Sequence, residues 1–109
     1  MLPQGEKDGV SRVFLPAAVI LIVGGALFLH ALLYWGWTED DAYITYRYAE
    51  NQARGEGLVF NSGERVEGYS NFLWVMMIAA GIRSGISPEF FSRSAGISAA
   101  IAAMFISYL

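Results

Sequence analysis

The stretch that decides the fold is VFLPAAVILIVGGALFLHALLYWGW, residues 13–37, which carries no charged side chain over its 25 positions. About 20 apolar residues in an α-helix cross a bilayer core about 30 Å thick, so this stretch predicts a transmembrane helix. Tyr34, Trp35 and Trp37 crowd its far end, which is typical of the aromatic belt at a membrane interface. A cleaved signal peptide is the competing interpretation, but its apolar region has only about 7–15 residues, which favours an uncleaved anchor.

The composition of the chain agrees with a membrane protein and excludes several other classes. Of the 109 residues 55% are hydrophobic, and the net charge is -3 with no basic run, so nothing indicates nucleic-acid binding. Cysteine is absent, which excludes disulfides and thiolate metal sites. The single histidine, His30, has no second histidine at ligand spacing. We therefore interpret His30 as a helix-interface or headgroup-depth residue.

The second apolar stretch, FLWVMMIAAGI at residues 72–82, is too short to cross a membrane. As a helix it would be about 16 Å long, against a hydrocarbon core of about 30 Å. Trp74 and a pair of methionines favour a helix at residues 72–84 that lies in the membrane interface or re-enters it. Two alternatives stay open, namely a tilted helix that continues past Arg83 and a buried core helix of a larger domain.

The third apolar stretch, SPEFFSRSAGISAAIAAMFISYL, predicts a second transmembrane helix at residues 88–109. Ser87 is placed to cap its N-terminus, Pro88 suits the first helical position, and Glu89 suits the first turn. Beyond Arg93 the stretch is uncharged, and its many small residues suit close packing against other helices in lipid. We therefore expect the chain to be the N-terminal part of a larger membrane protein.

These segments predict an all-α membrane protein with two transmembrane helices and an external loop that carries amphipathic juxtamembrane helices. A tail at residues 1–12 holds Lys7 and Arg12, and the loop at residues 38–71 holds seven acids and three arginines. The basic residues on the two sides are nearly balanced. The flank at Arg12 and the aromatic end of the first helix favour a cytoplasmic N-terminus and an acidic loop outside.

The loop opens with TEDDAYITYRYAENQAR, which predicts a helix at about residues 39–54. Thr38 and Asp41 fit a capping box, in which Thr38 caps the helix and Asp41 reaches back to it. The glutamate between them also gains from the dipole of the helix N-terminus. Glu39 and Asp41 thus both have a role in starting the helix. Asp40 is the acid left without an obvious structural role.

A projection at 100° per residue separates two faces of this helix. Its predicted packing face consists of Ala42, Thr45, Tyr46, Ala49 and Ala53. Asp40, Tyr43 and Arg47 fall together on another side, as one polar cluster next to the membrane. There Asp40 could accept a proton from a hydroxyl nucleophile, whereas Arg47 and Glu50 could form a surface pair worth only a few tenths of a kcal/mol.

The rest of the loop brings a second carboxylate toward the membrane. Asn61, Ser62 and Gly63 predict a turn, and Glu67 and Tyr69 stand just before the short apolar stretch. We therefore expect Glu67 to return to the membrane surface on the same side as the acids that open the loop. Two converging carboxylates could serve as a base and as the partner of a metal or amine. An ordinary polar loop is the alternative interpretation.

The residues EDDAYITYRYAENQARGEGLVFN and then GERVEGYSNFLW resemble the first external loop of GT-C superfamily membrane glycosyltransferases. The likeness is to the bacterial branch that includes arabinofuranosyltransferases and relatives of the protein O-mannosyltransferases, and it covers roughly residues 13–109. The pattern is an acid pair with an aromatic residue, then R-Y-A, G-x-G-L-V-F-N, and V-E-G-Y before an apolar helix.

The resemblance implies a mechanism in which an acceptor hydroxyl or amine attacks the anomeric carbon of a polyprenyl-phosphate-linked sugar, usually with inversion. An aspartate at the start of this loop acts as the base in the family. That position matches Asp40, with Asp41 as the second choice, and Glu67 matches a second acidic position more loosely. The implied substrate-binding residues are Tyr43, Arg47, Glu67 and Tyr69.

The resemblance also implies partners and a location. We expect a multi-pass protein of the bacterial plasma membrane, with the acidic loop on the periplasmic or extracellular side. Its partners would be the lipid-linked sugar, membrane lipids and the remaining transmembrane helices of a full-length enzyme, and the fragment alone would be inactive. Some relatives use a divalent metal ion, and the sequence decides neither the metal, the sugar nor the acceptor. The rival hypothesis is a small two-helix membrane anchor or interaction protein without catalysis.

Overall fold

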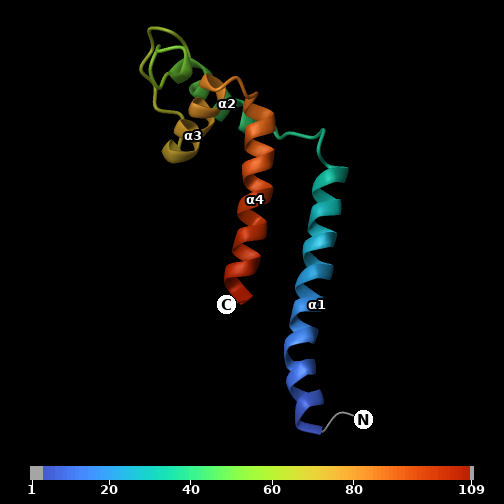
Figure 1. Ribbon diagram of the computed structural model, residues 1–109. Coiled ribbons are helices and arrows are strands. Elements are labelled where there is room, and N and C mark those ends of the chain that lie inside the picture. The colour runs from blue at the N-terminus through green and yellow to red at the C-terminus, as the bar shows by residue number, and fades with distance from the viewer. Residues whose placement is uncertain (1–3, 109) are drawn as a thin grey trace. The chain divides into compact units, whose positions relative to one another are not determined.

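The computed structural model describes residues 4–108 of the chain, with side chains from residue 14 onward. Within that range the structure consists of helices without strands, so the predicted all-α class is confirmed (Figure 1). The helices are α1 (Gln4–Leu33), α2 (Asp40–Ala53), α3 (Phe72–Arg83) and α4 (Pro88–Tyr108). They form two compact units, one made of α1 and of α4 from Ile97 onward, the other of residues 36–96.

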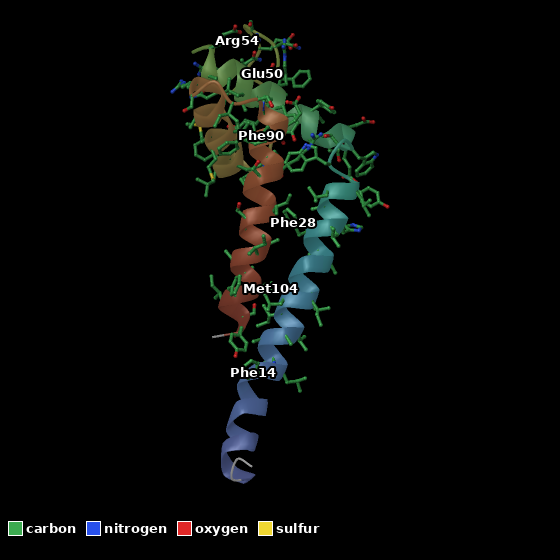
Figure 2. The ribbon with its side chains drawn as sticks, turned by 45° about the vertical axis from the view of Figure 1, so that its right-hand side comes forward. Phe14, Phe28, Glu50, Arg54, Phe90 and Met104 are labelled. Carbon is green, nitrogen blue, oxygen red and sulfur yellow. The ribbon has the colours of Figure 1, made fainter. Side chains whose placement is uncertain are left out.

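Two helical segments in the described part of the chain are long and apolar enough to cross a membrane, as the sequence predicts. They are Phe14–Leu33 in α1 and the whole of α4. The apolar windows of both segments contain no buried residue, and the side chains of Phe14 and Phe28 are 69% and 47% exposed (Figure 2). Extended apolar surface of this kind suits contact with lipid.

The ends of α1 differ from the bounds expected from composition. The helix is already formed at Gln4, within the stretch expected to be a tail, and it stops at Leu33. The next residues make a turn in which the Tyr34 amide donates to the His30 carbonyl at 3.2 Å. The rings of His30 and Tyr34 also lie against each other, with centroids 4.8 Å apart. The aromatic residues after Leu33 therefore follow the helix instead of extending it.

The second unit has a small hydrophobic core between α2 and α3, which pack side by side (Figure 1). The core residues are Tyr46, Tyr48, Ala49, Val75, Ile78 and Ala79. The predicted packing face of α2 is confirmed at Tyr46 and Ala49, while Ala42 and Ala53 pack at its margin. The prediction did not include Tyr48 and Asn51 among the buried residues. They are 2% and 1% exposed because the following loop folds back over them.

The start of α2 corrects one prediction. The helix begins at Asp40, Glu39 takes the N-cap position, and no side chain caps it, so the predicted capping box of Thr38 and Asp41 is wrong. The Thr38 hydroxyl instead accepts a hydrogen bond from the guanidinium of Arg93, with Nη2 and Oγ1 2.6 Å apart. A charged donor makes a stronger hydrogen bond than a backbone amide, which explains the different use of this hydroxyl.

The other helix ends follow the signals in the sequence. At the start of α4, the Phe90 amide donates to the Ser87 hydroxyl at 3.3 Å, which confirms the predicted cap. At the end of α3, Gly85 has φ +84°, a conformation that favours glycine and stops the helix soon after Arg83. This turn rules out a continuous helix past Arg83. The buried side of α3 faces α2, and its place at the membrane interface stays a prediction.

Candidate functional site

The two candidate catalytic carboxylates open α2. Asp40 and Asp41 lie in its first turn and are exposed, so the positive end of the helix dipole stabilises their negative charge. Together with residues 37–39 they line an open depression of about 400 Å³. Within residues 14–108, neither carboxylate forms a salt bridge or a hydrogen bond through its side chain. Both are therefore available to a ligand or to a reacting hydroxyl.

The polar cluster predicted around Asp40 does not form as expected. Arg47 turns to the loop, where its Nε donates to the carbonyl of Phe60 at 3.2 Å. The ring of Tyr43 meets Tyr46 edge to face, with centroids 5.6 Å apart. Tyr43 and Arg47 are both exposed, and neither is among the residues that line the depression. Arg47 and Tyr43 thus have partners other than Asp40.

The ion pair on the surface of α2 also differs from the prediction. Glu50 pairs with Arg54, at 4.0 Å, instead of with Arg47 (Figure 2). Arg47 is held by the loop carbonyl, which leaves Arg54, one helical turn beyond Glu50, as the partner. The pair is largely exposed, and pairs of this kind contribute little to stability.

Two buried side chains of α2 hold the loop that follows it, and the sequence reasoning missed both. The Tyr48 hydroxyl bonds the loop at Val66 and at Gly68. The Asn51 side-chain amide donates to the carbonyls of Val59 and Phe60, at 2.8 and 2.9 Å. A signal was present, because a tyrosine and an asparagine three positions apart share one side of a helix. Their partners, 8 to 20 positions away, were not predictable from spacing alone.

The second pair of candidate residues lies in the loop. Glu67 and Tyr69 line a depression of about 240 Å³ together with Glu56, Arg65, Val66 and residues 57–59. Glu67 is exposed, whereas Tyr69 is half-buried, with its ring centroid 5.0 Å from that of Tyr48. This lining shares no residue with the depression at the start of α2. The structure thus places the candidate carboxylates in two depressions, not in one shared cavity.

The described residues do not assemble a metal centre. Among the side chains described, those of residues 14–108, no group of three or more histidine, aspartate or glutamate residues is arranged to hold a metal ion. Glu39 has an extended backbone at the N-cap, whereas Asp40 and Asp41 are successive helical residues whose side chains project about 100° apart.

Comparison with known proteins gives partial matches. No family model matches the chain, and neither does any solved structure. The terminal β-(1→2)-arabinofuranosyltransferase of Mycobacterium tuberculosis is 38% identical over an alignment of 52 residues, and the match covers 43% of this chain and 8% of that protein. The protein of the same name from Corynebacterium glutamicum is 47% identical over 38 residues, 35% of this chain and 6% of that one. The chain resembles part of an arabinofuranosyltransferase.

This likeness confirms the resemblance to bacterial arabinofuranosyltransferases over a part of the chain. The matched stretches span less than a tenth of the length of either curated relative. Two apolar helices of spanning length and the likeness to these enzymes together indicate a membrane protein. The roles of Asp40, Asp41, Glu67 and the other candidate residues stay predictions.

Proposed function

We propose that this chain is the N-terminal part of an integral-membrane glycosyltransferase that moves a sugar from a polyprenyl-phosphate donor to a cell-envelope glycan, lipid or protein acceptor. The observation that carries the proposal is the 38% identity over 52 residues to a terminal arabinofuranosyltransferase. The names of both relatives favour an arabinofuranosyl residue as the sugar transferred. The helices of spanning length in α1 and α4 support a substrate carried on a membrane lipid.

In the proposed reaction Asp40 is the general base. The acceptor hydroxyl attacks the anomeric carbon of the donor sugar as the Asp40 carboxylate takes the hydroxyl proton. The bond between the anomeric carbon and the phosphate oxygen breaks, the electron pair leaves with the polyprenyl phosphate, and the configuration inverts. Proton removal of this kind typically contributes a factor of about 10²–10⁴ to the rate. The exposure of Asp40 and its lack of an intramolecular ion pair in the described chain support this role.

The position of Asp40 also suits a lipid-linked donor. The apolar segment of α1 ends at Leu33, and Asp40 follows after six residues that include two tryptophans, which favour the membrane–water interface. The phosphate of a polyprenyl donor lies at that interface. Asp41 is the second candidate, and it projects about 100° around α2 from Asp40, so one of the two carboxylates faces a given acceptor.

The remaining candidates would contact the sugars. Arg47 uses Nε for the Phe60 carbonyl, which leaves its terminal amino groups for oxygens of a substrate. Tyr43 is 51% exposed and can offer both a ring face and a hydroxyl. Glu67 and Tyr69 line the loop depression, where a carboxylate can accept hydrogen bonds from sugar hydroxyls. In this proposal the loop lies on the outer side of the bacterial plasma membrane.

Sugar transfer by the full-length protein tests the proposal. Membranes that contain it should move labelled pentose from a polyprenyl-phosphate donor to an arabinan acceptor, and matched membranes without it should not. A nucleotide-linked form of the same sugar should give no product when lipid carriers are removed. Absence of transfer from any lipid-linked pentose or hexose would contradict the proposal and favour the anchor or interaction protein. Transfer from the nucleotide sugar alone would instead contradict the lipid-linked donor.

A further inference from the structure

One buried hydroxyl holds the loop on both sides of Glu67. The Tyr48 hydroxyl donates to the carbonyl oxygen of Val66 at 2.8 Å and accepts from the amide nitrogen of Gly68 at 2.9 Å. These two residues directly precede and follow Glu67 in the chain. A phenol has one hydrogen to donate and lone pairs to accept, so both of its capacities are used here. The backbone that carries the Glu67 side chain is thereby fixed to α2.

The ring of Tyr48 fixes a second residue of the same loop. Tyr48 is 2% exposed, and its ring centroid lies 5.0 Å from that of Tyr69 at an interplanar angle of 64°. Edge-to-face pairs of this kind favour one relative orientation of the two rings. The ring also meets Phe60, with centroids 5.8 Å apart. The hydroxyl therefore orients Glu67, and the ring orients Tyr69.

Gly68 shows how closely the loop approaches. A Cβ added there would lie 2.8 Å from the Tyr48 hydroxyl oxygen and 3.6 Å from the nearest ring carbons. The conflict is with the hydroxyl oxygen, because 3.6 Å is ordinary contact. A glycine is thus required at this position for the two hydrogen bonds to form with their observed lengths. We call the contact of Tyr48 with Val66, Gly68 and Tyr69 the clamp, because it holds the loop against α2 at a fixed distance.

The two residues that Tyr48 orients, Glu67 and Tyr69, both line the loop depression. Its side chains include two carboxylates, a guanidinium and a phenol, from Glu56, Glu67, Arg65 and Tyr69. Such a set accepts and donates hydrogen bonds in several directions and adds one aromatic ring. A sugar ring, with hydroxyls around its edge and C–H groups on its faces, matches that chemistry. Tyr48 does not line the depression, so it acts through the residues that do.

We propose that Tyr48 is a positioning residue that sets Glu67 and Tyr69 for one sugar ring of the carbohydrate substrate in the loop depression. The inference rests on the proposed glycosyl transfer and deepens it, because it assigns this depression to substrate binding separately from the base at the start of α2. The sugar ring belongs either to the acceptor or to the donor, and the two have the same hydroxyl chemistry. Kinetics with each substrate varied in turn distinguish them.

Hydrogen exchange tests the clamp without any need for activity. In the full-length protein in detergent, Tyr48→Phe should speed exchange of the Gly68 amide about tenfold, because its hydrogen-bond acceptor is lost. Tyr46→Phe is the matched control. It removes a hydroxyl from the same helix, one that makes no hydrogen bond within the described chain. Equal exchange at Gly68 in Tyr48→Phe and in the parent protein would overturn the proposal.

Steady-state kinetics test the positioning role. Tyr48→Phe should raise KM about tenfold for one substrate and leave kcat within about twofold, while Tyr46→Phe changes neither. A higher acceptor KM places the acceptor sugar in the depression, and a higher donor KM places the donor sugar there. A lower kcat with both KM values unchanged would overturn the proposal. If the parent protein transfers no sugar, the proposed function fails and the substrate assignment falls with it, while exchange at Gly68 still decides whether the clamp exists.

Discussion

The guanidinium of Arg93, in the second turn of α4, donates a hydrogen bond to the hydroxyl of Thr38, 55 positions earlier in the chain, at 2.6 Å. Thr38 stands two residues before α2 and belongs to the same compact unit as Arg93. The bond therefore fixes the segment that leads into Asp40. The start of α2 is set by this contact with α4, not by a capping side chain of its own.

Replacing Thr38 should reveal this bond. Thr38→Val keeps the shape of the side chain and removes the acceptor, so it should lower the free energy of unfolding by about 1–2 kcal/mol, whereas Thr38→Ser should change it little. Thermal unfolding of the full-length protein in detergent measures both. In an Arg93→Ala background the Thr38→Val effect should disappear. An undiminished effect there would mean that the hydroxyl acts on α2 itself.

Gly68 should tolerate alanine only when the Tyr48 hydroxyl is removed. Gly68→Ala places a methyl group 2.8 Å from that oxygen, and overpacking of this kind costs about 1–3 kcal/mol. In Tyr48→Phe the same substitution should cost much less. Gly63→Ala is the control, because Gly63 has φ +88° with open space around it, so its strain is in the backbone and Tyr48→Phe should not relieve it. Thermal unfolding measures Gly68→Ala and Gly63→Ala, each with and without Tyr48→Phe. If Tyr48→Phe changed the cost of both alanine substitutions equally, the account would be contradicted.

Gly81 should also not tolerate alanine, because Phe91 of α4 lies close to it. A Cβ at Gly81 would lie 2.6 Å from the ring of Phe91, so Gly81→Ala should destabilise the protein by about 1–3 kcal/mol. Phe91→Leu should relieve most of that cost. Gly96→Ala, in the exposed interior of α4 with nothing within 4 Å, should instead stabilise by about 0.5–1 kcal/mol. A similar loss at Gly81 and Gly96 would show that the contact with Phe91 is not responsible.

The proposed topology places residues 39–87 outside the membrane. The chain contains no cysteine, so a single introduced cysteine reports on its own position. Ser62→Cys and Ser84→Cys should both react with an impermeant thiol reagent added from outside the cell. Both positions are exposed in the structure, so burial will not mask them. Reaction at position 62 without reaction at position 84 would show that α3 crosses the membrane.

Local signals in the sequence were enough to place the helices. The uncharged run before Leu33 and the cap at Ser87 each act within a few residues of where they stand. Such signals depend on helix geometry and membrane thickness, which are the same in every protein. They predicted the all-α class and the two apolar spans.

Contacts between distant residues were not predictable in the same way. The Thr38 hydroxyl fits a helix cap in every local respect, and only the arrival of Arg93 from α4 gives it another partner. Tyr48 and Asn51 likewise look like surface residues until the loop returns onto them. The candidate carboxylates were expected to converge, but the returning loop gives Glu67 a depression of its own.

The central claim, that Asp40 is the base of a glycosyl transfer, is tested most directly by sugar transfer in membranes that carry Asp40→Asn or Asp41→Asn in the full-length protein. The amide keeps the size of the carboxylate but cannot take a proton, so Asp40→Asn should lower the rate by about 10²–10⁴ at unchanged expression, with a milder loss for Asp41→Asn. Near-parental transfer by Asp40→Asn, alongside an inactive Asp41→Asn, would move the base to Asp41. Parental transfer by both variants would contradict the account.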